Sequence, residues 1–194
     1  MNKLKVLFVG NSYTYFNEMP KTIFYRLAAG AGYDVEVTQI TKGGYRLCQF
    51  ADPEDEAGKR LRETVAGARY DYAVLQEQSI NPITNEEQFL SGVRDVASLI
   101  SADQFILYAT WGRGDGSPKL ELLGLDCEQM TQGLSTAYNK AGLMIGARVA
   151  EVGKAFLEYA KNHDRSELYN SDKSHPSEIG SEVAARVILE TITG

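Results

Sequence analysis

The sequence predicts an α/β fold in which helices cover a parallel sheet of five strands. Short apolar runs rich in Val, Ile, Leu or aromatic residues alternate along the chain with longer amphipathic segments, which is the pattern of strands joined by helices. The first, third and fourth apolar runs lack polar alternation, as expected of strands that are buried on both faces. These observations suggest a doubly wound sheet with flavodoxin-like strand order.

The pattern gives each element a place along the chain. The five expected strands are residues 5–10, 34–41, 71–76, 104–110 and 143–149. The expected helices are residues 19–31, 54–68, 86–101, 127–141, 152–162 and 177–191. Asn17 is a suitable N-cap for the first helix and Gly30 or Gly32 a suitable stop, while Asn85 would cap the third helix. Residues 111–126 include several glycines and a proline, so we expect a long loop there.

Length and composition limit the possible functions. The 194 residues are enough to bury a full core and no linker divides them, so residues 1–194 are expected to form one domain. A net charge of −6, with no lysine or arginine cluster, argues against nucleic-acid binding. No apolar run approaches the roughly 18 residues that span a bilayer, so we expect no membrane partner.

The start of the chain and its cysteines bear on compartment and cofactors. Only four apolar residues, 6–9, follow the basic start before Gly10, and no small-residue cleavage site comes after them, so we expect no signal peptide. Cys48 and Cys127 lack the spacing of metal ligands, and reduced thiols are typical of the cytoplasm. We therefore expect a cytoplasmic protein without a cysteine-bound metal.

Two segments from opposite ends of the chain carry the residue types of a serine hydrolase. Ser12 follows the first expected strand on a tight turn, and Asp172 precedes His175 by three residues, which lets the carboxylate reach Nδ1. A serine nucleophile needs a base within hydrogen-bond reach, and the base needs a carboxylate to orient it. The alternative is that Ser12 only satisfies backbone groups of the turn. The other histidine, His163, lies at a polar helix end, so His175 is the expected base.

The ends of the second and third expected strands offer groups that could stabilise negative charge. Gly43 and Gly44 allow a close backbone approach or a positive φ, and either could contribute an N–H, although a plain turn is the simpler interpretation. Gln76 and Gln78 each carry an amide that can donate to an oxyanion. Alternatively, these glutamines cap the next loop, or Gln76 ties adjacent strand-end loops together.

The end of the fourth strand provides two further candidates. Trp111 could wall a substrate pocket, and core packing is an equally good interpretation. Arg113 could pair with a carboxylate of a substrate, although most loop arginines are simply solvated.

Taken together, Gly10-Asn11-Ser12-Tyr13, Gly43-Gly44, residues 76–79 and Asp172 to His175 resemble the SGNH hydrolase superfamily, the relatives of GDSL esterases and lipases. The resemblance covers the whole chain and implies a three-layer α/β/α sandwich with a five-stranded parallel sheet. It also implies Ser12 as nucleophile, His175 as base, Asp172 as its orienting group, and an oxyanion hole from the N–H of Ser12, a glycine N–H and a side-chain amide.

The chain departs from the family pattern at two places. Asn11 stands where Asp is usual, in a position that carries no proton chemistry. The usual Gly-x-Asn-Asp after the third strand is replaced by Gln76-Glu77-Gln78-Ser79, so Gln78 takes the asparagine position by counting and Gln76 is the fallback. Gly44 is the preferred glycine donor and Gly43 the alternative.

The resulting interpretation is a serine hydrolase of carboxylic esters, an esterase or O-deacetylase that acts on small or carbohydrate esters. The expected catalytic residues are Ser12, Asp172 and His175, and the expected pocket residues are Asn11 and Trp111. This chemistry requires neither a metal nor an organic cofactor. One rival is a flavodoxin-like binding module in which Ser12 and Thr14 cradle a phosphate. Another is an inactive relative that binds sugars without cleaving them.

Overall fold

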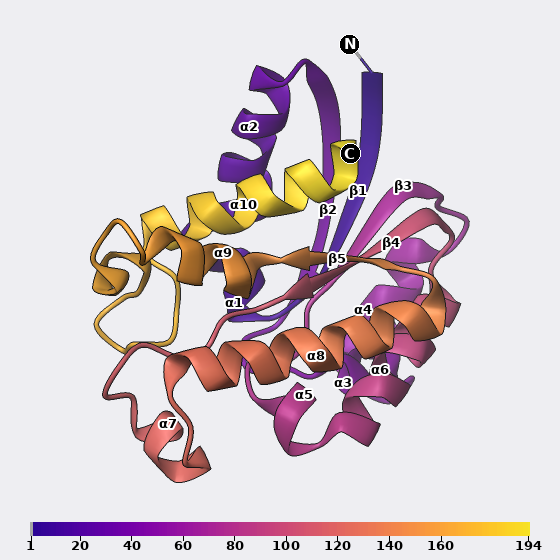
Figure 1. The fold of residues 1–194 in the computed structure, drawn as a ribbon. Coiled ribbons are helices and arrows are strands. Elements are labelled where there is room, and N and C mark those ends of the chain that lie inside the picture. Colours follow the sequence, from indigo (N-terminus) through magenta and orange to yellow (C-terminus); the bar gives the residue numbers. More distant parts are fainter. Residues whose placement is uncertain (1) are drawn as a thin grey trace.

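A parallel sheet forms the centre of the computed structural model, which describes residues 2–194 (Figure 1). Its strand order is β2-β1-β3-β4-β5, the flavodoxin-like order that the sequence predicts. The strands are β1 (Asn2–Gly10), β2 (Tyr33–Thr41), β3 (Tyr70–Leu75), β4 (Ala102–Ala109) and β5 (Arg148–Glu151). Every neighbouring pair is parallel, so the carboxyl ends of all five strands meet at one edge.

Helices cover both faces of this sheet, which confirms the predicted three-layer sandwich (Figure 1). The longer ones are α4 (Glu56–Val65), α6 (Glu86–Leu99), α8 (Cys127–Ile145), α9 (Val152–Tyr159) and α10 (Glu178–Thr193). The shorter ones are α1 (Ser12–Tyr15), η1 (Phe16–Glu18), η2 (Met19–Phe24), α2 (Tyr25–Gly30), α3 (Leu47–Ala51), α5 (Asn81–Thr84), α7 (Pro118–Leu123) and η3 (Arg165–Leu168). None of the helices in residues 2–194 has the length and apolarity required to cross a bilayer.

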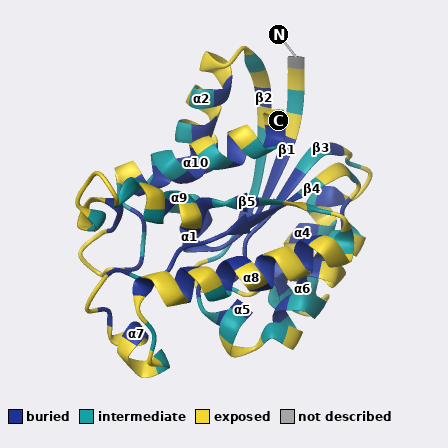
Figure 2. Cartoon of the chain, in the orientation of Figure 1, coloured by how far each residue is buried: buried dark blue, intermediate teal, exposed yellow. Residues whose placement is uncertain are grey.

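The core is divided into two halves by the sheet. On β1, Val6 and Phe8 pack with residues of η2, α2, α9 and α10, whereas Leu7 and Val9 pack with residues of α3, α4, α6 and α8. Alternate residues of a strand point to opposite faces, so a strand that is covered on both sides must be apolar throughout. Burial follows this arrangement: β1, β3 and β4 are buried towards their carboxyl ends, whereas the edge strands β2 and β5 are only partly buried and the outer helix faces are exposed (Figure 2).

The prediction of a strand at residues 143–149 is wrong in its first half. Helix α8 continues to Ile145, and Leu143 within it is 87% exposed. The helix ends at Gly146, because this residue takes the left-handed conformation at φ 68° and the right-handed helix cannot continue through it. The apolar run Leu143-Met144-Ile145 therefore belongs to the last turn of a helix, and β5 begins only at Arg148.

The predicted N-cap of the first helix is also wrong. Asn17 has a φ of 53°, and its Nδ2 donates to the carbonyl of Pro176 at 3.1 Å and to Ser181 Oγ at 2.8 Å. Its side chain thus ties the segment after Ser12 to the segment after His175 instead of capping η2. The predicted cap at Asn85 is confirmed, because its side chain accepts the N–H of Gln88.

Six short helices were not expected from the sequence: α1, η1, α3, α5, η3 and α7. The last lies within the predicted loop 111–126, where Pro118 opens a helix of six residues that ends at Gly124. Helices of this length are only marginally stable by themselves, so their patterns in the sequence are weak.

Candidate active site

Ser12 lies at the carboxyl edge of the sheet, at the first position of α1. The preceding Asn11 caps this helix, since its Oδ1 accepts the N–H of Tyr13 at 3.1 Å. Gly10 makes the turn possible, because a Cβ there would lie 2.5 Å from Thr14 Oγ1 and 2.7 Å from Gln76 Oε1. The sequence therefore turns directly from a buried strand into a helix, and only 8% of the Ser12 surface is exposed.

His175 connects Ser12 to Asp172 through a continuous chain of polar contacts. Its Nε2 lies 2.9 Å from Ser12 Oγ, and its Nδ1 lies 2.5 Å from Asp172 Oδ2. A carboxylate can only accept hydrogen bonds, so the proton of a neutral imidazole belongs on Nδ1. Nε2 is then free to accept the hydroxyl proton of Ser12, which is the geometry required of a general base.

Asp172 is held ionised by the same turn. Although partial burial acts to raise the pKa of its carboxyl, the hydrogen bonds from the His175 ring and from the backbone N–H groups of His175 and Ser174 lower that pKa below its ordinary value. Both N–H groups donate to Oδ1 at 3.0 Å. The carboxylate therefore stays charged and keeps its orientation towards the imidazole.

Aromatic side chains fix the plane of the imidazole. Phe16 stacks on the His175 ring with centroids 4.3 Å apart and planes inclined by 16°, and Tyr13 meets it edge-on at 5.6 Å. Sequence reasoning assigned no site role to Phe16. The sequence feature that could have indicated this role is the group of aromatic residues directly after Ser12, because the predicted strands and helices do not by themselves explain aromatic residues there.

The prediction that Trp111 walls a substrate pocket is wrong. Its side chain is completely buried between Tyr13, at a centroid distance of 4.8 Å, and Phe156, at 4.3 Å. Its indole N–H donates to the carbonyl of Ser174 at 3.1 Å. Trp111 therefore packs beneath the site and anchors the loop that carries His175.

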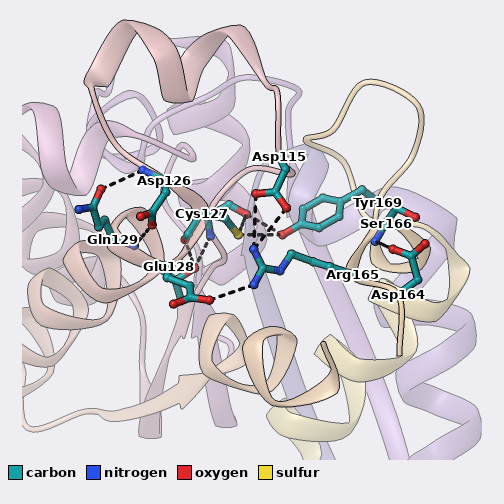
Figure 3. Close-up of polar contacts among 11 residues, drawn as sticks. Asp115, Asp126, Cys127, Glu128, Gln129, Asp164, Arg165, Ser166 and Tyr169 are labelled. Carbon is teal, nitrogen blue, oxygen red and sulfur yellow. Dashed lines mark hydrogen bonds and ion pairs between the residues drawn. The ribbon is translucent and has the colours of Figure 1, made fainter. Parts of the chain in front are cut away.

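Further contacts join the loop after β4 to the loop that carries Asp172 and His175. Gly114 N–H donates to the carbonyl of Lys173 at 2.8 Å, and Tyr169 Oη donates to the carbonyl of Gly112 at 2.7 Å. Figure 3 shows the guanidinium of Arg165 between two carboxylates, those of Asp115 at 3.4 Å and Glu128 at 3.1 Å. These contacts position a loop that has little regular structure of its own.

A cavity of about 200 Å³ opens over Ser12 and His175. Of the predicted site residues, Asn11, Gly44 and Gln78 also line it, whereas Gly43, Gln76 and Trp111 do not. The remaining lining residues are Tyr13, Ser79, Arg113 and Ser174. The structure thus brings together residues that follow β1, β2, β3 and β4 and the loop before α10.

Gly44 is the glycine that faces this cavity. Its φ of 73° is a conformation that glycine adopts without strain. Its N–H donates no hydrogen bond to any residue in the described part of the chain. The neighbouring Gly43 packs closely against the hydroxyl of Tyr15, with a hypothetical Cβ at 3.0 Å from that oxygen, and lies outside the cavity.

The two glutamines at the end of β3 have different environments. Gln76 is 1% exposed, its Oε1 accepts the N–H of Asn11 and the hydroxyl of Thr14, both at 2.9 Å, and its Nε2 donates to the carbonyl of Glu77. This arrangement corresponds to the predicted alternative in which Gln76 ties strand-end loops together. Gln78 uses only its Oε1 for the loop, accepting the N–H groups of Ile80 and Asn81, while its Nε2 has one long contact of 3.5 Å with Ser79.

Glu77, which the sequence analysis left without a role, links the loops that carry Gly44 and Gln78. Its completely buried carboxylate accepts the N–H of Gln78 at 2.6 Å and the N–H of Leu47 at 3.2 Å. Burial raises the pKa of Glu77 to about 7, although these two hydrogen bonds act to lower it. The sequence feature that could have indicated this role is a glutamate between two glutamines at the end of a buried strand, because a buried charge needs hydrogen-bond partners.

His163 lies apart from these residues. Its ring is exposed, stacks on Tyr159 at 4.2 Å and has its Nδ1 3.2 Å from the Tyr159 carbonyl. This position at a polar helix end agrees with its exclusion as a base.

Comparison with known proteins gives structural relatives but no match to a family model or to a curated protein. A protein of Slackia heliotrinireducens, described as a candidate SGNH hydrolase, is 31% identical, with a TM-score of 0.82 over 98% of this chain and 100% of its own. A DUF4886 family protein from Bacteroides uniformis is 18% identical, with a TM-score of 0.80 over 99% of this chain and 83% of its own. A family 3 carbohydrate esterase of Clostridium thermocellum is 14% identical, with a TM-score of 0.68 over 97% and 94%.

Proposed function

Because the chain belongs to the SGNH hydrolase superfamily, we propose that it is a serine hydrolase of carboxylic esters. The observation that carries the proposal is the contact chain from Ser12 Oγ through His175 to Asp172, at 2.9 and 2.5 Å. Serine is a poor nucleophile without a base at this distance, and the base is oriented here by an ionised carboxylate.

In the acylation step, Ser12 Oγ attacks the carbonyl carbon of the ester while its proton passes to His175 Nε2. The imidazolium that forms is stabilised by Asp172. As the tetrahedral intermediate collapses, His175 returns the proton to the departing alcohol, which leaves the acyl group on Ser12. In the deacylation step, a water molecule attacks the carbonyl carbon of the acyl-enzyme while His175 Nε2 takes its proton. His175 then returns the proton to Ser12 Oγ as the acid is released.

Three donors around the cavity would hold the negative charge of the tetrahedral intermediate. The N–H of Ser12 is at the first position of a helix and therefore lacks an intrahelical acceptor. The N–H of Gly44 and the Nε2 of Gln78 border the same cavity with unused donor capacity. Pre-positioned donors of this kind supply a large part of the rate enhancement in acyl transfer.

The size of the cavity favours a small acyl group. Its volume of about 200 Å³ lies below the roughly 300–1,000 Å³ typical of sites for drug-sized ligands. We therefore include O-deacetylation of small or carbohydrate esters in the proposal, and the name of the carbohydrate esterase from C. thermocellum agrees with it.

The phosphate-binding alternative has less support. Thr14 is 1% exposed and its hydroxyl donates to Gln76 Oε1, so it is already used inside the protein. Phosphate binding by Ser12 and Thr14 would also not require the contact between Asp172 and His175. The second rival, a sugar-binding relative without activity, differs from the proposal only in whether Ser12 reacts.

Reaction with a fluorophosphonate probe tests this point. The probe phosphonylates a serine only if a base removes its proton, so we expect stoichiometric labelling of the wild-type protein at Ser12 and none in Ser12→Ala. Peptide mapping by mass spectrometry identifies the labelled residue. A folded wild-type protein that resists labelling would support the inactive, sugar-binding alternative.

A further inference from the structure

Arg113 is the only arginine or lysine side chain that lines the cavity over Ser12 in the described residues. It follows β4 by four residues, after the buried Trp111 and Gly112, and is itself half-buried. The anchored position of Trp111 and the contact between the neighbouring Gly114 N–H and Lys173 fix the backbone on both sides of it. Its location is therefore set by the fold.

The guanidinium of Arg113 has few partners within the protein. One terminal nitrogen donates to Ser79 Oγ at 2.9 Å, while Nε is buried and has no acceptor among residues 2–194. No carboxylate of the described chain forms an ion pair with it. Asp172, the carboxylate of the contact chain, is occupied by His175 and by two backbone N–H groups.

A half-buried cation without a counter-charge is costly, because its desolvation is not compensated by an ion pair. An arginine also presents five N–H donors in a planar fork that matches a carboxylate in two-point contact. The protein as a whole carries a net charge of −6, so long-range attraction does not gather anions at its surface. An anionic group would have to be recognised locally, by a residue placed as Arg113 is.

We propose that Arg113 is a specificity-determining residue that binds a carboxylate of the substrate, so that the preferred esters carry a negative charge near the scissile bond. This inference rests on the proposed function, because it assumes that the cavity over Ser12 receives the ester. The carboxylate can belong to the acyl group or to the alcohol, and the shared chemistry is an anion in contact with the guanidinium.

Two pairs of esters distinguish these sources. 4-Acetoxybenzoate and 4-acetoxybenzamide differ by a charge on the alcohol side, whereas 4-nitrophenyl hydrogen succinate and 4-nitrophenyl butyrate differ by a charge on the acyl side. We expect the wild-type protein to prefer the charged member of one pair by about 10- to 100-fold in kcat/KM, as a charge-assisted hydrogen bond would give. Equal rates within both pairs would overturn the proposal without any variant being needed.

Variants at Arg113 separate recognition of charge from support of the fold. Arg113→Gln should reduce the ratio between the charged and the neutral ester by roughly tenfold or more, and Arg113→Lys should restore part of it, since it keeps the charge but not the fork. Arg113→Glu should invert the ratio. A residue that only supports Ser79 would lower the rates of both esters in parallel and leave the ratio unchanged, which would contradict the proposal.

A binding experiment keeps the inference independent of turnover. In Ser12→Ala, calorimetry compares the affinities of the charged and neutral members of each pair, with and without Arg113→Gln. Preferential binding of one carboxylate ester that is lost with Arg113→Gln would support the proposal even if the protein failed to hydrolyse esters. Absence of any such preference would overturn it, whereas failure of fluorophosphonate labelling bears only on the proposed hydrolase.

Discussion

The floor and the mouth of the candidate site use similar residue types in opposite ways. We define the floor by Thr14, Gln76 and Trp111, which are at most 1% exposed and whose polar side chains bond to other parts of the protein. We define the mouth by Ser12, Gly44, Gln78, Arg113 and His175, which line one cavity. The floor satisfies its hydrogen-bonding groups internally, whereas the mouth retains donors without acceptors.

This difference teaches which polar residues can act on a ligand. A buried polar group that has found its partners contributes to stability and has little left to offer a substrate. A donor that the fold holds in place without an acceptor can still form its hydrogen bond with a ligand or a transition state. We therefore expect substitutions in the mouth to change activity and substitutions in the floor to change stability.

The largest effect in the mouth is expected for His175→Gln. Loss of the proposed general base should lower kcat for a short-chain ester on the order of 10⁴-fold or more, the range found when the histidine of a Ser-His-Asp triad is removed. Because hydrogen bonds lower the pKa of Asp172, its carboxylate stays charged and keeps orienting the imidazole as the solution is acidified. Only a neutral imidazole can accept the proton of Ser12, so we expect wild-type activity to fall with decreasing pH.

The pH–rate profile provides the measurement. Any residual activity of His175→Gln should lack the loss at acid pH that the wild type shows, with His163→Gln as a matched control that retains it. An unchanged acid limb in His175→Gln would assign the titration to another group.

The two glutamines provide the sharpest contrast between floor and mouth. Gln78→Ala should lower kcat by on the order of 10²–10³ with a smaller change in KM, because its amide would donate to charge that exists only in the transition state. Gln76→Ala should instead lower the free energy of unfolding, since the N–H of Asn11 and the hydroxyl of Thr14 would lose their acceptor, at about 1–3 kcal/mol for each unsatisfied group.

Steady-state kinetics and urea unfolding of both variants make this comparison. A large loss of kcat in Gln76→Ala, with none in Gln78→Ala, would assign the donor to the floor and reverse the comparison. Loss of kcat in neither variant would leave the oxyanion to backbone N–H groups alone.

A smaller, pH-dependent effect is expected at Glu77, beneath the loops of Gly44 and Gln78. Its pKa of about 7 in the folded protein lies above the ordinary 4.5, so the folded state holds a proton that the unfolded state has lost. Its contribution to stability is fully present below about pH 4.5 and is lost as the pH rises through 7, by on the order of 3 kcal/mol.

Glu77→Gln removes this titration, so its stability should decline less than that of the wild type between pH 4.5 and 8. Urea unfolding at several pH values measures the difference between the two slopes. The amide substitution also lowers the free energy of unfolding by an amount that does not depend on pH, because it replaces one acceptor by a donor. It therefore leaves the slope of the free energy against pH unchanged. Parallel pH dependences in the two proteins would show that Glu77 does not titrate in this range.

Much of the fold could be predicted from the alternation of apolar and amphipathic segments. A strand covered on both faces leaves a continuous apolar run, as in Val6 to Val9, and this signal is strong. The failure at residues 143–149 has the same origin, because an exposed apolar run at a helix end has the composition of a strand. Only the position of Gly146 at a left-handed helix end distinguishes the two.

The candidate site could be predicted where chemistry restricts the residue type. Ser12, Asp172 and His175 are found from spacing and from the scarcity of histidine, and the structure brings them into contact. Trp111 was misplaced because an aromatic residue after a strand can turn towards the cavity or beneath it, and packing against Phe156 decides this. The same limit applies to Phe16, whose stacking on His175 depends on tertiary structure.

The central claim is that Ser12 is the nucleophile of an ester hydrolase, and the most direct test is the hydrolysis of 4-nitrophenyl acetate by the wild type and by Ser12→Ala at matched concentration. Removal of the Ser12 hydroxyl costs one small group and one side-chain hydrogen bond, that to His175 Nε2, so both proteins should unfold at nearly the same temperature. We expect hydrolysis by the wild type and rates at the level of the uncatalysed reaction for Ser12→Ala. Full activity in a folded Ser12→Ala protein would contradict the account.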